Sequence, residues 1–291
     1  MKNLIIRTAS GVLFLAIMTG AILWSVHAFW ILSCIIVIAG MIEFFNMTIP
    51  NVHKLQKVIS IFVGLSGLLI FNPSVHHNPF SIFIIIGVII LAVACFYMIP
   101  IIELYKKSEK PFQNISLLIL PIIYVALPFV LMNCMNILFK NGDLFHYELT
   151  GKNYILAFFI LIWTNDVGAY CFGMLLGQHG KHKLFPRISP KKTWEGFIGG
   201  IIMTVIAGML ISKFMLDGKN MHHWIIIAII TSVFGTFGDL IESMLKRSAG
   251  VKDSGKIMPG HGGILDRFDA VLLSFPIFFI YFLIFNLFIF F

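Results

Sequence analysis

The sequence predicts an all-α polytopic membrane protein with about nine transmembrane helices, and three observations support this prediction. Hydrophobic residues make up 59% of the 291 residues, whereas charged residues make up only 12%. The mean hydropathy is +0.95, which excludes an ordinary soluble globular domain. Apolar runs of about 20 residues, long enough to cross a bilayer as helices, follow one another along the whole chain.

The predicted spans are separated by short polar connections. They cover residues 4–24, 27–47, 55–71, 80–102, 115–139, 154–177, 196–216, 223–246 and 268–290. The first span follows Lys2 and Arg7, as the apolar part of a signal peptide would. No convincing small-residue cleavage site comes after it and eight more spans follow, so we interpret it as a retained helix.

The distribution of charge predicts how the protein is oriented. The net charge is +8, but 17 of the 21 Lys and Arg fall on the side of the membrane that holds the N-terminus. Because positive residues gather on the cytoplasmic side, the N-terminus is predicted to be cytoplasmic and the C-terminus to lie opposite. Much of the basic excess therefore sets the topology, and no nucleic-acid partner is expected.

Two regions differ in their content of polar motifs. Residues 1–150 hold about five spans, and residues 151–291 hold about four spans together with every motif that suggests chemistry. The longest polar connections, 178–195 and 247–267, are both predicted to be cytoplasmic. We therefore expect an integral multi-pass protein of the cell (inner) membrane, with a catalytic C-terminal region whose active site faces the cytoplasm.

The segment 238–269 is the strongest candidate site because it holds five acids and five Lys or Arg within 32 residues. Asp239, Ser243 and Lys246 are spaced at i, i+4 and i+7, which places them on one face of a helix. Lys246 and Arg247 would also suit a helix end whose long side chains extend to the lipid headgroups. Asp239 has a short side chain inside a span, which favours a functional role.

Asp266 and Asp269 lie at i and i+3 where the ninth span begins. Together with Asp239 they would form a set of hard oxygen ligands suited to Mg²⁺, which takes its remaining ligands from water and substrate phosphates. Asp166, near the middle of the sixth span, is a fourth candidate ligand. It would either pair with a Lys or Arg or face a polar cavity, and we favour the cavity. A second metal, or a monovalent cation such as K⁺, is a further candidate cofactor.

Several residues are candidates for binding phosphate. The Pro-Gly-His-Gly-Gly segment 259–263 would bring backbone N–H groups against an anion, although most such turns are only turns. Lys192 lies in a loop whose five positive charges and interfacial Trp194 also suit an ordinary cytoplasmic loop. The predicted phosphate and nucleotide contacts are Lys192, Ser243, Lys252, His261, Gly262, Gly263 and Arg267. The predicted catalytic residues are Asp239, Asp266, Asp269, Lys246 and Arg247.

Three motifs are more specific than the general pattern of charge. The longest runs from Ser243 to Asp269, and the others are Ser-Pro-Lys-Lys-Thr-Trp-Glu-Gly at 189–196 and Asp-Val-Gly-Ala-Tyr at 166–170. Together they resemble the phosphatidate cytidylyltransferase family, whose members are also called CDP-diacylglycerol synthases. The motif-bearing match covers roughly residues 160–275. The stretch 171–180 departs from the family pattern, which is usually shorter here and has a basic residue after the glycine.

The resemblance implies that CTP and phosphatidate react to give CDP-diacylglycerol and pyrophosphate, with Mg²⁺ as cofactor, in a membrane-embedded homodimer. The residue chemistry agrees, since a lipid phosphate can attack the α-phosphorus of CTP without a side-chain nucleophile. One alternative is a related CTP-dependent membrane enzyme with another lipid acceptor. A transporter is a second alternative, but its acids should extend through the membrane, whereas these gather at one face.

Overall fold

The computed structural model describes a chain that is almost entirely helical. Its described residues are 2–50, 52–75, 80–139, 150–177, 182–215, 220–258 and 262–290, with side chains described from residue 8 to residue 285. Within this part, seven helices are long and apolar enough to cross a membrane. A shorter apolar helix covers Thr8–Trp24. The prediction of an all-α polytopic membrane protein is confirmed.

Two compact units make up the chain, and each contains two separate stretches of the sequence. The first contains Met1–Ile137 and Asp253–Arg267, and the second contains Leu138–Lys252 and Phe268–Phe291. The predicted regions instead divided at residue 150 and assigned the whole connection 247–267 to the second region. The segment 253–267 belongs with the first unit because backbone and side-chain groups within it are hydrogen-bonded to Glu43.

The first unit is built from consecutive membrane helices. They are α1 (Lys2–Trp24), α2 (Val26–Thr48), α3 (Lys54–Ile70), α4 (Ser81–Tyr105), α5 (Pro111–Pro121), the π-helical turn η2 (Ile122–Ala126) and α6 (Leu127–Leu138). The Ser25 hydroxyl caps α2 by accepting from the Ala28 amide at 3.0 Å. The π-turn directly follows Pro121, which has no N–H to continue the regular ladder.

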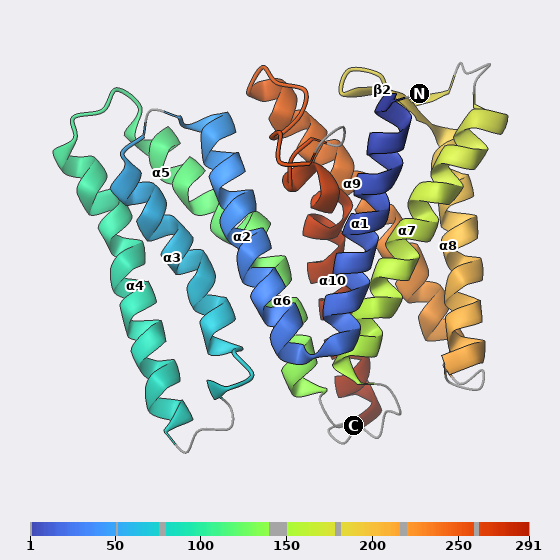
Figure 1. Ribbon diagram of the computed structural model, residues 1–291, viewed down its shortest axis with the longest axis horizontal. Helices are drawn as coiled ribbons and strands as arrows, with labels where there is room; N and C mark the ends of the chain where they lie inside the picture. Colours follow the sequence, from blue (N-terminus) through green and yellow to red (C-terminus); the bar gives the residue numbers. More distant parts are fainter. Residues whose placement is uncertain are drawn as a thin grey trace. The chain divides into compact units, whose positions relative to one another are not determined.

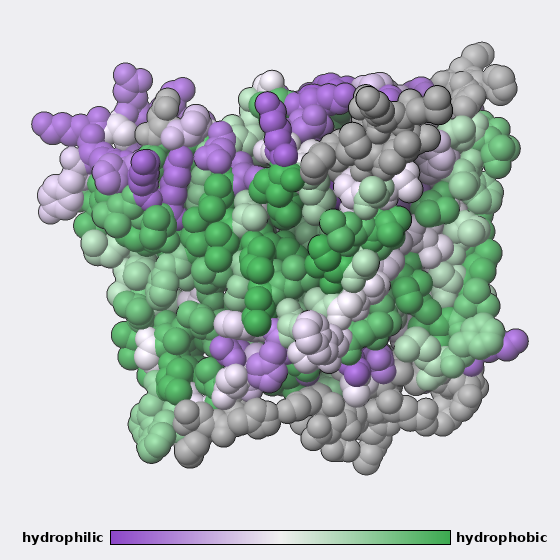
Figure 2. Space-filling model, in the orientation of Figure 1, coloured by the Kyte–Doolittle hydropathy of each residue, from purple (hydrophilic) through white to green (hydrophobic). Residues whose placement is uncertain are grey.

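Polar contacts between helices supplement apolar packing in this unit. The Ser60 hydroxyl donates to the Leu118 carbonyl at 2.6 Å, and the Trp30 indole donates to the Leu68 carbonyl at 2.7 Å. Such bonds are favoured in a bilayer because hydrocarbon offers polar groups no alternative partner. Over α2–α5, Figure 2 shows an apolar belt, with hydrophilic side chains at the end where α2 passes to α3 and α4 to α5 in Figure 1.

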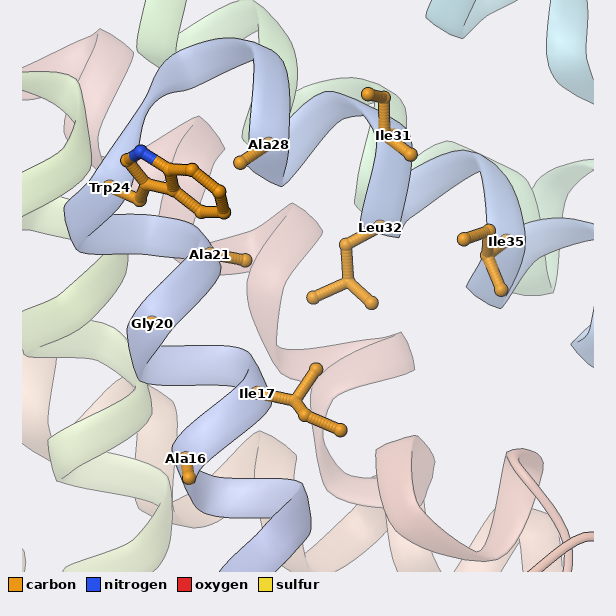
Figure 3. A pocket seen from close by; sticks show the side chains of 9 residues that line it. All are labelled: Ala16, Ile17, Gly20, Ala21, Trp24, Ala28, Ile31, Leu32 and Ile35. Atoms are coloured by element: carbon orange, nitrogen blue, oxygen red, sulfur yellow. The ribbon is translucent and has the colours of Figure 1, made fainter.

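An apolar groove of about 440 Å³ lies between α1 and α2 (Figure 3). It is lined by Ala16, Ile17, Gly20, Ala21, Trp24, Ala28, Ile31, Leu32 and Ile35. Several of these side chains are exposed, including Ile31 and Ile35 at 53% and 56%. Apolar surface of this kind is compatible with lipid. No charged side chain lines the groove.

The second unit carries most of the predicted site. It contains α7 (Gly151–Leu175), β1 (Lys183–Phe185), β2 (Ser189–Thr193), α8 (Trp194–Met215), α9 (Met221–Ser248) and the greater part of α10 (Leu265–Phe290). Glycines let α7 and α8 approach closely, since a Cβ on Gly196 would lie 2.8 Å from the Ala169 carbonyl oxygen. The rings of Phe158, Phe275 and Phe278 pack together in the interior of the unit.

Candidate active site

A short hairpin positions Lys192. The predicted loop 178–195 contains antiparallel strands in its described part, with Lys183 paired to Thr193 and Phe185 to Ser189. The Thr193 hydroxyl then accepts from the Gly196 amide at 3.1 Å, which caps α8. Lys192 therefore directly precedes Thr193, the residue that caps α8.

Lys192 forms an ion pair with Asp239 on α9. Its Nζ lies 2.6 Å from Asp239 Oδ2 and also donates to the Thr236 carbonyl at 3.3 Å. The Ser243 hydroxyl, one turn along α9, donates to Asp239 Oδ1 at 3.3 Å. Both Asp239 oxygens therefore have polar neighbours, as expected for a carboxylate held in one orientation. These contacts bring together Lys192, Asp239 and Ser243, all predicted site residues.

Gly238 allows α9 and α10 to approach closely beside this pair. A Cβ at this position would lie 2.5 Å from the Asp269 carbonyl oxygen and 3.2 Å from that of Ala270. Both neighbours are backbone atoms, which cannot rotate out of the way as a side chain can. The absence of a side chain at Gly238 thus brings the helix segment of Asp239 close to that of Asp269.

Asp269 is the centre of a group of carboxylates. It is half-buried, and it interacts electrostatically with Asp239, Asp166 and Glu242. Asp166 comes from α7, where it is exposed, and Glu242 is buried on α9 at 2% exposure. The sequence prediction included Asp166 among the candidate metal ligands but did not include Glu242 among the catalytic, metal-binding or phosphate-binding residues. Carboxylates in a low-dielectric region repel one another strongly, and a cation relieves that repulsion.

Lys246 and Arg247 have different environments although they are adjacent. Lys246 is 9% exposed and forms an ion pair with Glu242 at i, i+4. Arg247 is exposed, and its Nη1 donates to the Val251 carbonyl at 3.1 Å, which closes the turn after α9. Lys252, just beyond that turn, is exposed. Lys246 therefore lies with the carboxylates, whereas Arg247 and Lys252 are available at the surface.

Asp266 belongs to a separate hydrogen-bonded loop in the first unit. Its Oδ2 accepts from the amide and hydroxyl of Ser254, both at 2.9 Å, and from the Gly263 amide at 2.8 Å. These bonds close the loop before α10. Asp266 thus has a structural role in addition to the metal-binding role predicted for it.

The glycine-rich segment is only partly described. His261 lies outside the described residues, as do residues 259 and 260. Gly262 adopts φ +86°, a conformation that favours glycine, and its carbonyl accepts from the Met258 amide at 2.9 Å. The Gly263 amide is committed to Asp266, while Arg267 is half-buried in the first turn of α10. The predicted phosphate-binding role of Gly263 therefore cannot use its amide as the loop stands.

The only candidate metal ligands that the sequence predicted are carboxylate oxygens. Among the described residues, no three His, Cys, Asp or Glu converge closely enough to hold an ion by themselves. Magnesium commonly uses only one or two carboxylates, together with water and substrate phosphates. Asp239 and Asp269 suit this pattern chemically. The assignment of Mg²⁺ remains a prediction.

Comparison with known proteins identifies the family. The chain matches the model of the Cytidylyltransferase family over residues 5–285. The chain belongs to the cytidylyltransferase family. A phosphatidate cytidylyltransferase of Staphylococcus haemolyticus is similar to this cytidylyltransferase, with 33% identity over 272 residues, 94% of this chain and 96% of the relative. One from Staphylococcus aureus (strain COL) is 34% identical over 276 residues, again 94% and 96% of the two chains.

The family match confirms the predicted enzyme class, a nucleotidyltransferase, and the resemblance seen in the three motifs. It extends beyond the motif-bearing part, since the match begins at residue 5. Sequence reasoning about this cytidylyltransferase did not assign a role to Glu43. That residue is the only acid among the first hundred, which is the signal that could have drawn attention to it.

Proposed function

We propose that this cytidylyltransferase transfers the cytidylyl group of CTP to phosphatidate, in the synthesis of phospholipids. A phosphate oxygen of phosphatidate attacks the α-phosphorus of CTP, and a new phosphorus–oxygen bond forms. The bond from the α-phosphorus to the oxygen that bridges to the β-phosphorus breaks, so that pyrophosphate leaves and CDP-diacylglycerol remains. The near full-length similarity to phosphatidate cytidylyltransferases supports this substrate pair.

The observation that carries the mechanism is Lys192 held against Asp239 at 2.6 Å. Phosphoryl-group transfer needs positioned positive charge more than it needs covalent help from the protein. An ammonium group that is fixed by a carboxylate and a carbonyl is already oriented for a phosphate oxygen. We assign Lys192 to the phosphates of CTP, with Ser243 keeping Asp239 in the orientation that holds it.

Asp239 and Asp269 are the residues that would hold Mg²⁺, with Asp166 beside them. Bound there, the ion would neutralise charge on the phosphate oxygens of CTP. Lys246 offsets the charge of Glu242 within the same group of carboxylates. Arg247, Lys252 and Arg267 are assigned to the anionic parts of the two substrates. These roles agree with the charge and exposure of each side chain.

The direct test follows pyrophosphate release by the purified protein with radiolabelled CTP and Mg²⁺. Release that requires phosphatidate, with label recovered in CDP-diacylglycerol, is the expected result. Equal release without lipid would contradict the proposed reaction. Label recovered only with a polyprenol phosphate or an archaeal ether lipid would instead assign a different acceptor.

We also propose that the site faces the cytoplasm, because 17 of the 21 Lys and Arg fall on that side by sequence. Lys191→Cys, in a background without the native cysteines, should react with a membrane-impermeant maleimide only in inverted vesicles. Reaction only in right-side-out vesicles would reverse the orientation.

The homodimer implied by the family resemblance predicts twice the 32.9 kDa chain mass by light scattering in detergent, after subtraction of the micelle.

A further inference from the structure

Glu43 links α2 to the start of α10 within the first unit. Its carboxylate is 5% exposed, and its Oε1 accepts from the Ile264 amide at 2.9 Å. Its Oε2 accepts from the Leu265 amide at 3.1 Å and from the Ser254 hydroxyl at 3.1 Å. The bonded groups are 211 to 222 residues away along the chain. Glu43 therefore acts as a cap that α2 supplies to α10.

This arrangement satisfies groups that a helix cannot satisfy by itself. The first amides of a helix have no intrahelical acceptors, and negative charge at this end also interacts favourably with the helix dipole. A carboxylate in an apolar helix is costly to bury unless several donors compensate it. The amides of Ile264 and Leu265 supply that compensation to Glu43. The carboxylate thus satisfies amides that would otherwise lack an acceptor, and the amides offset the free-energy cost of burying the carboxylate.

The same contacts determine where Asp266 is held. The Ser254 hydroxyl lies within hydrogen-bonding distance of both Glu43 Oε2, at 3.1 Å, and Asp266 Oδ2, at 2.9 Å. Gly263 and Gly255 lie so close to Glu43 that a Cβ on Gly263 would be 2.6 Å from Oε1. A side chain at either position would collide with the Glu43 carboxylate and disturb its hydrogen bonds. The loop before α10 is thus closed around the Glu43 carboxylate.

We propose that Glu43 is a positioning residue for cytidylyl transfer, acting through the first turn of α10. By fixing the amides of Ile264 and Leu265, it sets the direction in which α10 begins. That direction orients Asp266, and Asp269 lies one turn further along the same helix. Glu43 itself does not touch substrate. This inference rests on the proposed function, because it assigns a role within that reaction.

Glu103 offers a matched control for the experiment. It is a second buried acid of the first unit, 2% exposed, in α4. Its carboxylate accepts from Gln56 at 2.9 Å, from Asn114 at 2.6 Å and from Ser108. None of these partners belongs to the loop before α10. Glu43→Gln and Glu103→Gln therefore both replace a buried, hydrogen-bonded carboxylate by an amide, but only one of them disturbs α10.

The experiment compares the two variants with wild type in detergent micelles. Glu43→Gln should lower kcat about 10- to 100-fold and raise the Mg²⁺ concentration for half-maximal activity, the range typical of losing a residue that holds a metal site in place. The KM for phosphatidate should stay within about twofold if the effect is on positioning. Hydrogen exchange of the 262–268 peptide should accelerate in Glu43→Gln only. Glu103→Gln should lose thermal stability but keep kcat within about twofold.

The outcomes separate this inference from the proposed function. If wild type fails to form CDP-diacylglycerol, the proposed function fails. If wild type is active and Glu43→Gln retains its kcat and Mg²⁺ dependence, the positioning role alone is wrong. An equal loss of kcat in both variants would reduce Glu43 to a general stabilising residue. Should Glu43→Gln not survive purification, Glu43→Asp keeps the charge but shortens its reach to the amides of Ile264 and Leu265. Unchanged kcat, Mg²⁺ dependence and peptide exchange in that variant would overturn the proposal.

Discussion

Lys192 and Asp239 are held together at 2.6 Å, although one ends a surface hairpin and the other lies in the C-terminal half of a membrane helix. The Lys192 ammonium also donates to the Thr236 carbonyl, one turn earlier on that helix. The pair thus joins the 189–196 motif to the segment 238–269, which the sequence distinguishes by its concentration of charge. It places a fixed positive charge beside the carboxylates that are proposed to hold Mg²⁺.

Replacing Lys192 should therefore impair catalysis far more than folding. Lys192→Met keeps the length of the side chain but removes the ammonium, and kcat should fall about 100-fold, as for loss of one preorganised donor. Lys191→Met is the matched control, since Lys191 is the exposed neighbour on the same strand. Steady-state kinetics with CTP would measure both. Similar losses in the two variants would indicate a general effect of hairpin charge.

The pairing of Lys192 with Asp239 could be predicted only in part. The sequence showed both residues as candidates, because charge in an apolar chain is conspicuous and helical spacing is regular. It did not show the hairpin, since Ser-Pro-Lys-Lys-Thr lacks the apolar alternation by which a strand is recognised. The membrane spans, in contrast, could be predicted from the sequence, because continuous hydrophobicity marks them directly. The predicted span 154–177 and the observed helix Gly151–Leu175 differ by only a few residues.

The role of Glu43 depends on contacts that sequence spacing does not reveal. No local pattern links it to Ile264 and Leu265, because their meeting depends on how helices pack. The same packing places 253–267 with the first unit rather than with the C-terminal spans. The predicted glycine-rich phosphate cradle illustrates the limit: Gly262 has the positive φ that favours glycine, but the Gly263 amide donates to Asp266 rather than being available to a phosphate.

Gly238→Ala should be destabilising because its new Cβ would meet backbone atoms of α10, 2.5 Å from the Asp269 carbonyl oxygen. Forcing helices apart in this way costs about 1–3 kcal/mol of unfolding free energy. It should also lower kcat by displacing Asp239 from Asp269. Gly87→Ala in α4 is the control, since nothing lies within 4 Å of its Cβ. The thermal unfolding temperature in detergent should be lower than wild type for Gly238→Ala and unchanged for Gly87→Ala.

The ion pair of Lys246 and Glu242 should contribute to stability mainly through mutual neutralisation. Breaking a buried pair by Lys246→Met should cost about 3–5 kcal/mol, because Glu242 then loses its positive partner. The double variant Lys246→Met with Glu242→Gln should recover most of that loss. A double-mutant cycle of unfolding free energies measures the coupling. Additive losses in the two single variants would show that the pair is not coupled.

Asp269→Asn and Asp266→Asn should separate metal binding from loop structure. In wild type, Mg²⁺ should raise the thermal unfolding temperature, since a ligand that binds only the folded state stabilises it. Asp269→Asn removes one charge from a group that also contains Asp239, Asp166 and Glu242, which relieves repulsion. In EDTA, the Asp269→Asn variant should therefore have an unfolding temperature at least as high as wild type. Mg²⁺ should raise that temperature little, and turnover should fall at least about 100-fold.

Asp266→Asn should behave differently, because Asp266 Oδ2 accepts three hydrogen bonds from Ser254 and Gly263. We expect it to abolish Mg²⁺-dependent turnover while the protein remains inserted and folded. The Asn side chain can present its nitrogen, a donor, where those bonds need an acceptor. The unfolding temperature of Asp266→Asn in EDTA should therefore fall below that of wild type. Thermal unfolding of both variants with and without Mg²⁺ makes the comparison. Near-normal turnover in Asp266→Asn would rule out a catalytic role, and a full Mg²⁺-induced shift in Asp269→Asn would exclude that residue as a ligand.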